Sequence, residues 1–379
     1  MTKFDHIRPY FDSEVNQALR NCLSHPMMKS LMEFTFPNKD DKYWKSKLRD
    51  THSIETFQTK IVYQSIKNVL ERSSEGLTTS GFDQLDNQTP YLFISNHRDI
   101  ILDTSLLNVK LFENGHIMTA SAIGDNLVQK EFLLELSKLN RNFLVQRSLA
   151  PRELLQSSQL MSQYIAHLIS NENRSVWIAQ REGRTKDGND VTHQGVIKML
   201  AMAREKNSVI SYLKKLKIVP VSISYEYDPT DALKLPQLIA LEKDQDYVKG
   251  KNEDFINLIS GILGQKKRIH IHVDKVIDRE CDFIESTIEN PNKQIQAFTQ
   301  VIDDSIHRNY KLWPTNYIAF DLLYKTNEYT SKYNLEEKDI FQRRLEMRID
   351  ANNSQSLKNF LNMYANPVVN QMKLINADA

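Results

Sequence analysis

The stretch YLFISNHRDIILD (residues 91–103) places a short apolar run directly before a polar segment that holds one histidine and two aspartates. Three more apolar runs follow, at residues 175–179, 218–225 and 269–276, with helical patterns between them. Strands that alternate with helices are typical of an α/β sheet covered by helices. We therefore predict an α/β fold with a central mixed sheet flanked by helices. Because apolar and polar residues alternate in 269–276, we expect an edge strand there.

Helical patterns at both ends of the chain enclose this α/β segment. We predict a helical N-terminal region at residues 1–76, an α/β domain at 77–280 and a helical C-terminal region at 281–379. The longest stretch without charged residues, 154–171, contains many polar side chains and has helical spacing. It is therefore expected to be a core-facing helix that opens at Pro151, and not a membrane span.

The composition disfavours several classes of protein. The 379 residues include 49 basic and 48 acidic ones, for a formal charge of +1, so a dedicated nucleic-acid binder is not expected. Only two cysteines, Cys22 and Cys281, are present and they lie far apart, which leaves no basis for a disulfide framework or a thiolate zinc site. The first ten residues lack the apolar stretch of an export signal. These features favour a cytoplasmic protein.

His97 is a candidate general base. It follows the first predicted strand, which is where an α/β sheet commonly places its active site. An imidazole with an unperturbed pKa of ~6.5 can accept a proton at neutral pH, and a carboxylate on its other nitrogen fixes the tautomer. The alternative is structural: His97 is then a turn residue, and Asp99 caps the helix that follows. This segment alone leaves both interpretations open.

Four blocks, in order, carry a family resemblance: the segment of His97 and three that follow it. They are SNHR (95–98) with Asp103, GDNL (124–127) with FLVQRS (143–148), EGRTK (182–186) and VPVSISY (219–225). Together they resemble the ordered blocks of the glycerolipid acyltransferases, most closely the glycerol-3-phosphate and dihydroxyacetone-phosphate branch. The segment LWPTNY (312–317) is similar to one in bacterial relatives. The resemblance covers roughly residues 77–227 and implies a glycerolphosphate acyltransferase-like fold.

The resemblance also implies roles for particular residues. His97 would remove a proton from a glycerol-type hydroxyl, and Asp103 would orient the imidazole. The hydroxyl oxygen would then attack the thioester of acyl-CoA or acyl carrier protein, with no covalent acyl-enzyme and no metal or prosthetic group. The implied substrate-binding residues are Arg147, Glu182, Gly183, Arg184 and Lys186. In this set the cations hold a phosphate, the glutamate orients an arginine or a substrate hydroxyl, and the glycine permits a close backbone approach or a positive φ.

Two spacings depart from the family pattern. Five residues separate His97 from Asp103, where the family usually has four, so Asp99 is a rival partner for the histidine. We favour Asp103, because Asp99 is better placed to cap the helix. Arg184 follows the glycine of its block directly, where the family has one residue between them. Either the turn is shorter, or Lys186 makes the phosphate contact.

The expected function is an O-acyltransferase of phospholipid biosynthesis that acts as a peripheral protein on the inner face of the cytoplasmic membrane. The acceptor stays open between a glycerol-3-phosphate-type molecule and a lysolipid. The basic clusters at 214–217 and 266–268 are either exposed strand-flanking charge or an attraction for anionic lipid or an acidic carrier protein. His270 and His272 are expected on a solvated strand face. The alternative function is a non-catalytic lipid- or acyl-carrier-binding protein on the same scaffold.

Overall fold

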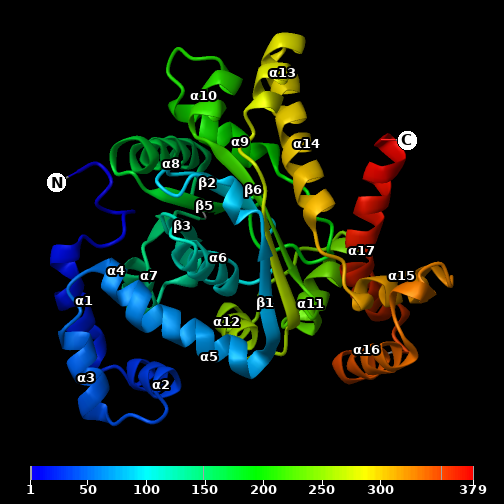
Figure 1. Cartoon of the computed structure of the whole chain (residues 1–379), viewed down its shortest axis with the longest axis horizontal. Helices are drawn as coiled ribbons and strands as arrows, with labels where there is room; N and C mark the ends of the chain where they lie inside the picture. Colours follow the sequence, from blue (N-terminus) through cyan, green and yellow to red (C-terminus); the bar gives the residue numbers. More distant parts are fainter. Residues whose placement is uncertain (1, 148, 351, 379) are drawn as a thin grey trace.

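The structure is a computed structural model that describes residues 2–147, 149–350 and 352–378. Within these residues seven strands form one sheet in the order β1-β7-β6-β2-β5-β3-β4 (Figure 1). Their bounds are β1 Ser74–Ser80, β2 Leu92–Ser95, β3 Thr119–Gly124, β4 Asn142–Val145, β5 Ser175–Ala179, β6 Ile218–Tyr225 and β7 Lys267–Val273. Strands β6, β2, β5, β3 and β4 are parallel, whereas β7 runs antiparallel to β6 and parallel to β1. The predicted mixed sheet is confirmed.

The central strands are buried because helices cover both faces of the sheet. All residues of β2 and β6 are buried, as expected for parallel strands with two covered faces. On one face Leu92 and Ile94 pack against α8 (Pro151–Asn171), α9 (Gln194–Leu200), α10 (Val209–Lys215), α13 (Arg279–Thr287) and α14 (Pro291–Asn309). On the other face Phe93 packs with α5 (Tyr63–Ser73) and α6 (Leu102–Glu113). The helix predicted to open at Pro151 is confirmed.

Each end of the chain adds a helical cluster with its own apolar core. The N-terminal helices are α1 (Asp12–Leu23), α2 (Pro26–Thr35), α3 (Asp41–Arg49) and α4 (Ile54–Phe57), which pack with α7 (Glu131–Leu139). The C-terminal cluster joins α11 (Asp231–Glu242) to α15 (Pro314–Tyr324), α16 (Leu335–Arg348) and α17 (Ser354–Asp378). Figure 1 shows the two clusters on opposite sides of the sheet. Helix α12 (Glu253–Leu263) lies between α11 and β7 in the chain.

The predicted boundaries at residues 77 and 280 do not coincide with the limits of the sheet and its core. Strand β1 begins at Ser74, so its first residues precede the predicted boundary at residue 77. Helix α14 follows the boundary at residue 280, yet Phe298 and Ile302 belong to the same apolar core as the central strands. As a division into domains, the three ranges stay a prediction.

Strand β7 corrects the expectation of an edge strand. It lies between β1 and β6, because the unpredicted strand β1 pairs along its outer side. The polar face of β7 is partly exposed, and its histidines bond to side chains of β1. His270 contacts the hydroxyls of Thr78 (2.8 Å) and Ser80 (3.0 Å), and His272 contacts Ser80 (2.8 Å). Burial, followed by the charge of Lys311, lowers the pKa of His270 to about 4.

The basic cluster at 266–268 is not an exposed patch. Lys266 is fully buried and donates a hydrogen bond to the Ser73 hydroxyl at 2.8 Å. Lys267 and Arg268 both contact the buried carboxylate of Glu226, at 2.9 and 2.5 Å. The ion pairs with Glu226 favour a structural role for Lys267 and Arg268, and an attraction of this cluster for lipid or for a carrier protein stays a prediction.

None of the helices in the described parts of the chain has both the length and the hydropathy needed to cross a membrane.

Candidate active site

His97 comes two residues after the end of β2, at the carboxyl edge of the five parallel strands. Its Nδ1 atom lies 2.8 Å from Oδ2 of Asp103, which stands in the first turn of α6. The Trp177 ring meets the imidazole in a T-shaped arrangement with 5.4 Å between centroids. The His97 side chain is 13% exposed and that of Asp103 is fully buried. The strand end and the helix start thus join a partly accessible imidazole to a buried acid.

Three further donors hold the Asp103 carboxylate. Oδ2 accepts hydrogen bonds from the backbone N–H groups of Arg98 (2.6 Å) and Asp99 (3.0 Å), and Oδ1 accepts one from the Tyr225 hydroxyl (2.9 Å). A carboxylate held in this way acts as an acceptor throughout, so Nδ1 of His97 donates to it. Nε2 is then the basic nitrogen of a ring that lines a cavity.

Asp99, the rival partner, caps α6 instead. Its Oδ1 accepts hydrogen bonds from the backbone N–H groups of residues 101 and 102, at 2.9 and 2.8 Å. Burial, followed by the charge of Asp103, raises the pKa of Asp99. Gly261 of α12 packs so closely that a Cβ there would lie 2.0 Å from Asp99 Oδ2. The block has one residue more than usual between His97 and Asp103, and this residue lengthens the loop before α6. The contact between His97 and Asp103 is formed all the same.

The loop after β5 carries residues 182–186 to the end of β2. The Gln180 N–H donates to the carbonyl of Ser95 at 2.8 Å, and the Thr185 N–H donates to the carbonyl of His97 at 2.7 Å. Gly183 has a φ of 70°, in the left-handed region that favours glycine. These two hydrogen bonds and the glycine turn bring the basic residues of the loop beside the imidazole.

A cavity of about 790 Å³ opens at this edge of the sheet. Its lining contains nearly all the residues predicted for the site, namely His97, Arg147, Glu182, Gly183, Arg184 and Lys186. Asp103 lies behind the imidazole. An apolar wall comes from β3, β4, α8 and α9, through Ala122, Ile123, Val145, Met161, Val196 and Met199. One cavity therefore combines a basic nitrogen, several cations and an apolar wall.

Lys186 and Arg184 form the cationic part of the cavity. Lys186 has no hydrogen-bond or ion-pair partner within the described ranges. Burial, followed by the charges of Arg184 and Lys234, lowers the pKa of Lys186 to about 8. The Arg184 guanidinium donates one hydrogen bond, to the Thr230 hydroxyl at 3.0 Å. An anion bound here would offset both the burial and the repulsion, so this part of the cavity suits a phosphate.

Arg147 and Glu182 form an ion pair at the rim of the cavity. The Glu182 side chain is 71% exposed and that of Arg147 is 30% exposed. Glu182 thus contacts the arginine of the second block and not the adjacent Arg184. Because a carboxylate already neutralises Arg147, Arg184 and Lys186 are the better candidates for holding an anion.

Two buried ion pairs behind the site were missed in the sequence. Arg98 contacts Asp190 at 2.5 Å, and Lys234 contacts Asp228 and also donates to the carbonyl of Arg98 at 3.2 Å. These contacts tie the turn after β2 to the loops after β5 and β6. Arg98 and Asp190 are 92 positions apart in the chain, so no local spacing signals them.

Two more residues of the site stood in or directly beside the blocks of the family resemblance. Arg181 lines the cavity directly before Glu182, and Tyr225 ends the predicted strand 218–225. Their position in or next to those blocks was the available signal. What the sequence lacked was the direction of each side chain.

One of three comparisons with known proteins matches a family model to the part of the chain that carries the site. Residues 76–224 match the family model described as Acyltransferase. No curated protein sequence matches the chain. The crystal structure of the 1-acyl-sn-glycerophosphate (LPA) acyltransferase PlsC from Thermotoga maritima aligns with 78% of this chain and 98% of that chain, at 11% identity and a TM-score of 0.37. The matched residues run from β1 to β6, so the part of the sheet that carries the site is similar to an acyltransferase domain.

Proposed function

We propose that this protein is an O-acyltransferase that moves a fatty acyl group from a thioester to a hydroxyl of a phosphorylated glycerol or a lysolipid. The observation that carries the proposal is the pair of His97 and Asp103, which lies in one cavity with Arg184, Lys186 and an apolar wall. The match of residues 76–224 to the Acyltransferase family model supports the class of reaction. The acyl donor is acyl-CoA or acyl carrier protein, and the proposed reaction needs no further cofactor.

The proposed chemistry uses the free nitrogen of His97. Nε2 removes the proton of the acceptor hydroxyl while the oxygen attacks the thioester carbonyl, and the imidazolium is stabilised by Asp103. The tetrahedral intermediate collapses with cleavage of the C–S bond, and the proton passes from the imidazolium to the departing thiolate. General-base assistance of this kind contributes ~10²–10⁴ in rate. Positioning of both substrates in the cavity supplies much of the remainder.

The acceptor phosphate is assigned to Arg184 and Lys186, because their charges face the cavity beside the imidazole. Guanidinium and ammonium groups bind phosphate oxygens through charge-assisted hydrogen bonds. The acyl chain is assigned to the apolar wall formed by β3, β4, α8 and α9. Both a glycerol-3-phosphate-type acceptor and a lysolipid present a hydroxyl and a phosphate, and the acceptor panel described below separates them.

Helix α12 supports the peripheral membrane location. Its two buried residues, Asn257 and Gly261, are polar or small, whereas its apolar side chains all remain at least partly exposed. Ile256 is 49% exposed and Leu263 is 61% exposed. Because Asn257 also lines the cavity, the outward apolar face of α12 flanks the site where a lipid substrate would enter. Contact with the surface of a membrane would cover this face.

The test is acyl transfer from radiolabelled acyl-CoA and acyl carrier protein to a panel of glycerol phosphates and lysolipids. We expect turnover by the wild-type protein and a loss of ~10²–10⁴ in kcat for His97→Ala with its fold intact. His52→Ala, at an exposed histidine outside the cavity, is the matched control and should keep wild-type rates. Full activity of His97→Ala rejects the general base. A wild-type protein that binds these substrates without turnover is instead the non-catalytic binding protein.

A further inference from the structure

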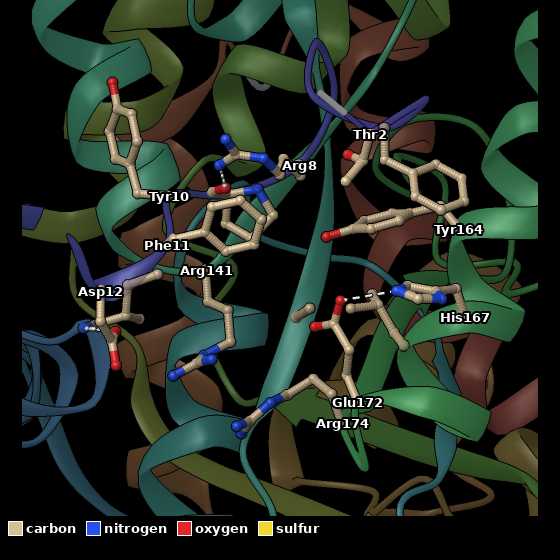
Figure 2. Close-up of a pocket in the computed structure, with 15 residues that line it drawn as sticks. Thr2, Arg8, Tyr10, Phe11, Asp12, Arg141, Tyr164, His167, Glu172 and Arg174 are labelled. Carbon is tan, nitrogen blue, oxygen red and sulfur yellow. Dashed lines mark hydrogen bonds and ion pairs between the residues drawn. The ribbon is translucent and has the colours of Figure 1, made fainter. Parts of the chain in front are cut away.

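A second cavity lies at the amino edge of the parallel strands, at the opposite end of the sheet from His97. It measures about 220 Å³, several times the ~30 Å³ share of a water molecule in the liquid. The N-terminal segment 2–12 forms one wall, and α8 and the starts of β4 and β5 form another (Figure 2). A hydrogen bond from the Leu144 N–H to the carbonyl of Ile7, at 2.9 Å, holds this segment against the sheet.

Two arginines enter this cavity. Arg141 stands directly before β4 and Arg174 directly before β5, and Figure 2 shows their side chains converging. Neither forms an ion pair within the part of the chain that the structure describes. Arg141 Nε donates to the side-chain oxygen of Gln58 at 3.3 Å, and Arg174 donates to the carbonyl of Met118 at 3.2 Å. Both partners are neutral, so the two charges are not compensated by them.

The acidic side chains of the cavity are engaged by other groups. Asp12 accepts a hydrogen bond from the Ile54 N–H at 2.9 Å, and Glu172 contacts His167 at 3.1 Å. The remaining cation, Arg8, is paired with the carboxylates of Asp5 and Glu14, which do not line the cavity. Two guanidinium groups that contact no carboxylate within the described residues are therefore left in the pocket, where the charges of Asp12, Glu55 and Glu172 act on them only from a distance.

The pKa values of Arg141 and Arg174 also favour a bound anion. Burial, followed by the charge of Arg174, lowers the pKa of Arg141 to about 10, and burial also lowers the pKa of Arg174. Two like charges that are largely withdrawn from water are unfavourable unless an anion joins them. Arg141 also has a φ of 60°, which is unusual for a residue other than glycine.

We propose that this cavity binds a small phosphate-type oxyanion between the guanidinium groups of Arg141 and Arg174. A tetrahedral oxyanion offers at least three acceptor oxygens and more than one negative charge. It suits two-pronged contacts with both guanidinium groups, and Figure 2 shows the Tyr164 hydroxyl directed into the same pocket. A carboxylate has two oxygens and one charge, so it satisfies fewer of these donors. The site does not depend on the proposed acyl transfer.

The test measures binding of inorganic phosphate by calorimetry in a protein that carries Arg184→Gln and Lys186→Gln, which removes the active-site cations. We expect saturable binding at one site in this background. Adding Arg141→Gln or Arg174→Gln should weaken the affinity about tenfold or more, through loss of a charge-assisted contact. Arg20→Gln removes the same charge from the exposed end of α1 and should leave the affinity within about twofold of the background protein.

A second measurement guards against variants that do not fold. In the same background, phosphate should slow hydrogen exchange of the backbone amides of residues 2–12, which wall the cavity. Titrations with sn-glycerol-3-phosphate and with vesicles that contain phosphatidic acid distinguish a soluble phosphate from a lipid headgroup, and tight binding of either supports the site. Absence of saturable phosphate binding in this background overturns the proposal. So does unchanged affinity in both arginine variants, or acetate that binds as tightly as phosphate.

Discussion

Two histidine–carboxylate pairs lie at opposite ends of the sheet, and only the first belongs to the proposed active site. His97 Nδ1 is 2.8 Å from Asp103, and His167 Nε2 is 3.1 Å from Glu172. The side chains of the first pair are 13% and 0% exposed, whereas those of the second are 39% and 45% exposed. Similar chemistry thus occurs in two environments, and the environments differ in burial and in the number of groups that hold the acid.

The two acids differ in the groups that hold them. Asp103 is held by two backbone N–H groups and the Tyr225 hydroxyl in addition to the imidazole. An exposed pair such as that of His167 and Glu172 competes with water and contributes little. The pair at the carboxyl edge also faces a cavity of about 790 Å³ with cations and an apolar wall. The two pairs therefore differ in the groups that orient the acid and in their surroundings, more than in the distance between the imidazole and the carboxylate.

The largest expected effect is a loss of kcat when the acid of the buried pair is replaced. In Asp103→Asn, the amide cannot stabilise the imidazolium and no longer selects the required tautomer, so kcat should fall by ~10²–10⁴. The corresponding change in the exposed pair, Glu172→Gln, should leave kcat within about twofold of the wild type. Steady-state acyl transfer, with circular dichroism as the control for folding, measures both variants. Equal losses in the two variants would mean that burial of the acid has no catalytic consequence.

The next effect concerns the charge beside His97. The pKa of Lys186 is about 8 in the protein, so this side chain is charged below that pH and loses its charge as the pH rises through it. The acceptor KM should therefore rise above about pH 8. Replacement of this lysine by methionine should lower kcat/KM about tenfold to a hundredfold at pH 7, through loss of a contact of ~1.5–3 kcal/mol.

Lys186→Arg provides the matched control, because a guanidinium stays charged over this range. We expect its acceptor KM to be flat between pH 7 and pH 9. A wild-type KM that does not change with pH would assign the phosphate to other cations of the cavity.

A smaller effect is expected at the apolar face beside the same cavity. Ile256→Glu or Leu263→Glu places a charge on α12 and should weaken binding to lipid vesicles about tenfold. Rates with a short-chain, water-soluble donor and acceptor should not change. Met347→Glu, at an 80% exposed methionine of α16, is the control and should bind vesicles normally. Vesicle binding that is insensitive to both α12 variants contradicts the proposed orientation.

The smallest effect is expected from a substitution that leaves the acid of the buried pair with fewer donors. Tyr225→Phe removes one of the donors to Asp103 and leaves Oδ1 of that carboxylate without it. The free energy of unfolding should fall by ~1 kcal/mol, and kcat should fall about threefold to tenfold. Urea unfolding and initial rates measure the two quantities. A variant with wild-type kcat would show that the backbone N–H groups alone suffice to hold the acid.

Local patterns in the sequence were enough to predict the class of fold. The runs at 175–179 and 218–225 became buried parallel strands, and the helix from Pro151 has its predicted start. Strand β1 was missed, because SEGLTTS has little apolar character and is stabilised by its pairing with β7. The edge position expected for residues 269–276 was wrong for the same reason. Pairing partners are non-local, so a strand's own pattern does not reveal its neighbours.

By itself, the sequence determined the alternation of strands and helices and named the side chains that meet at one edge of the sheet. The alternation follows from hydrophobic periodicity and the place of His97 from the end of its strand, whereas the other site residues were implied by the family resemblance of their blocks. Only the tertiary structure decided that Asp103 contacts His97 while Asp99 caps the helix, and that Lys186 lies in the cavity without a partner. Contacts of this kind depend on side-chain direction and on donors far apart in the chain, which local spacing does not specify.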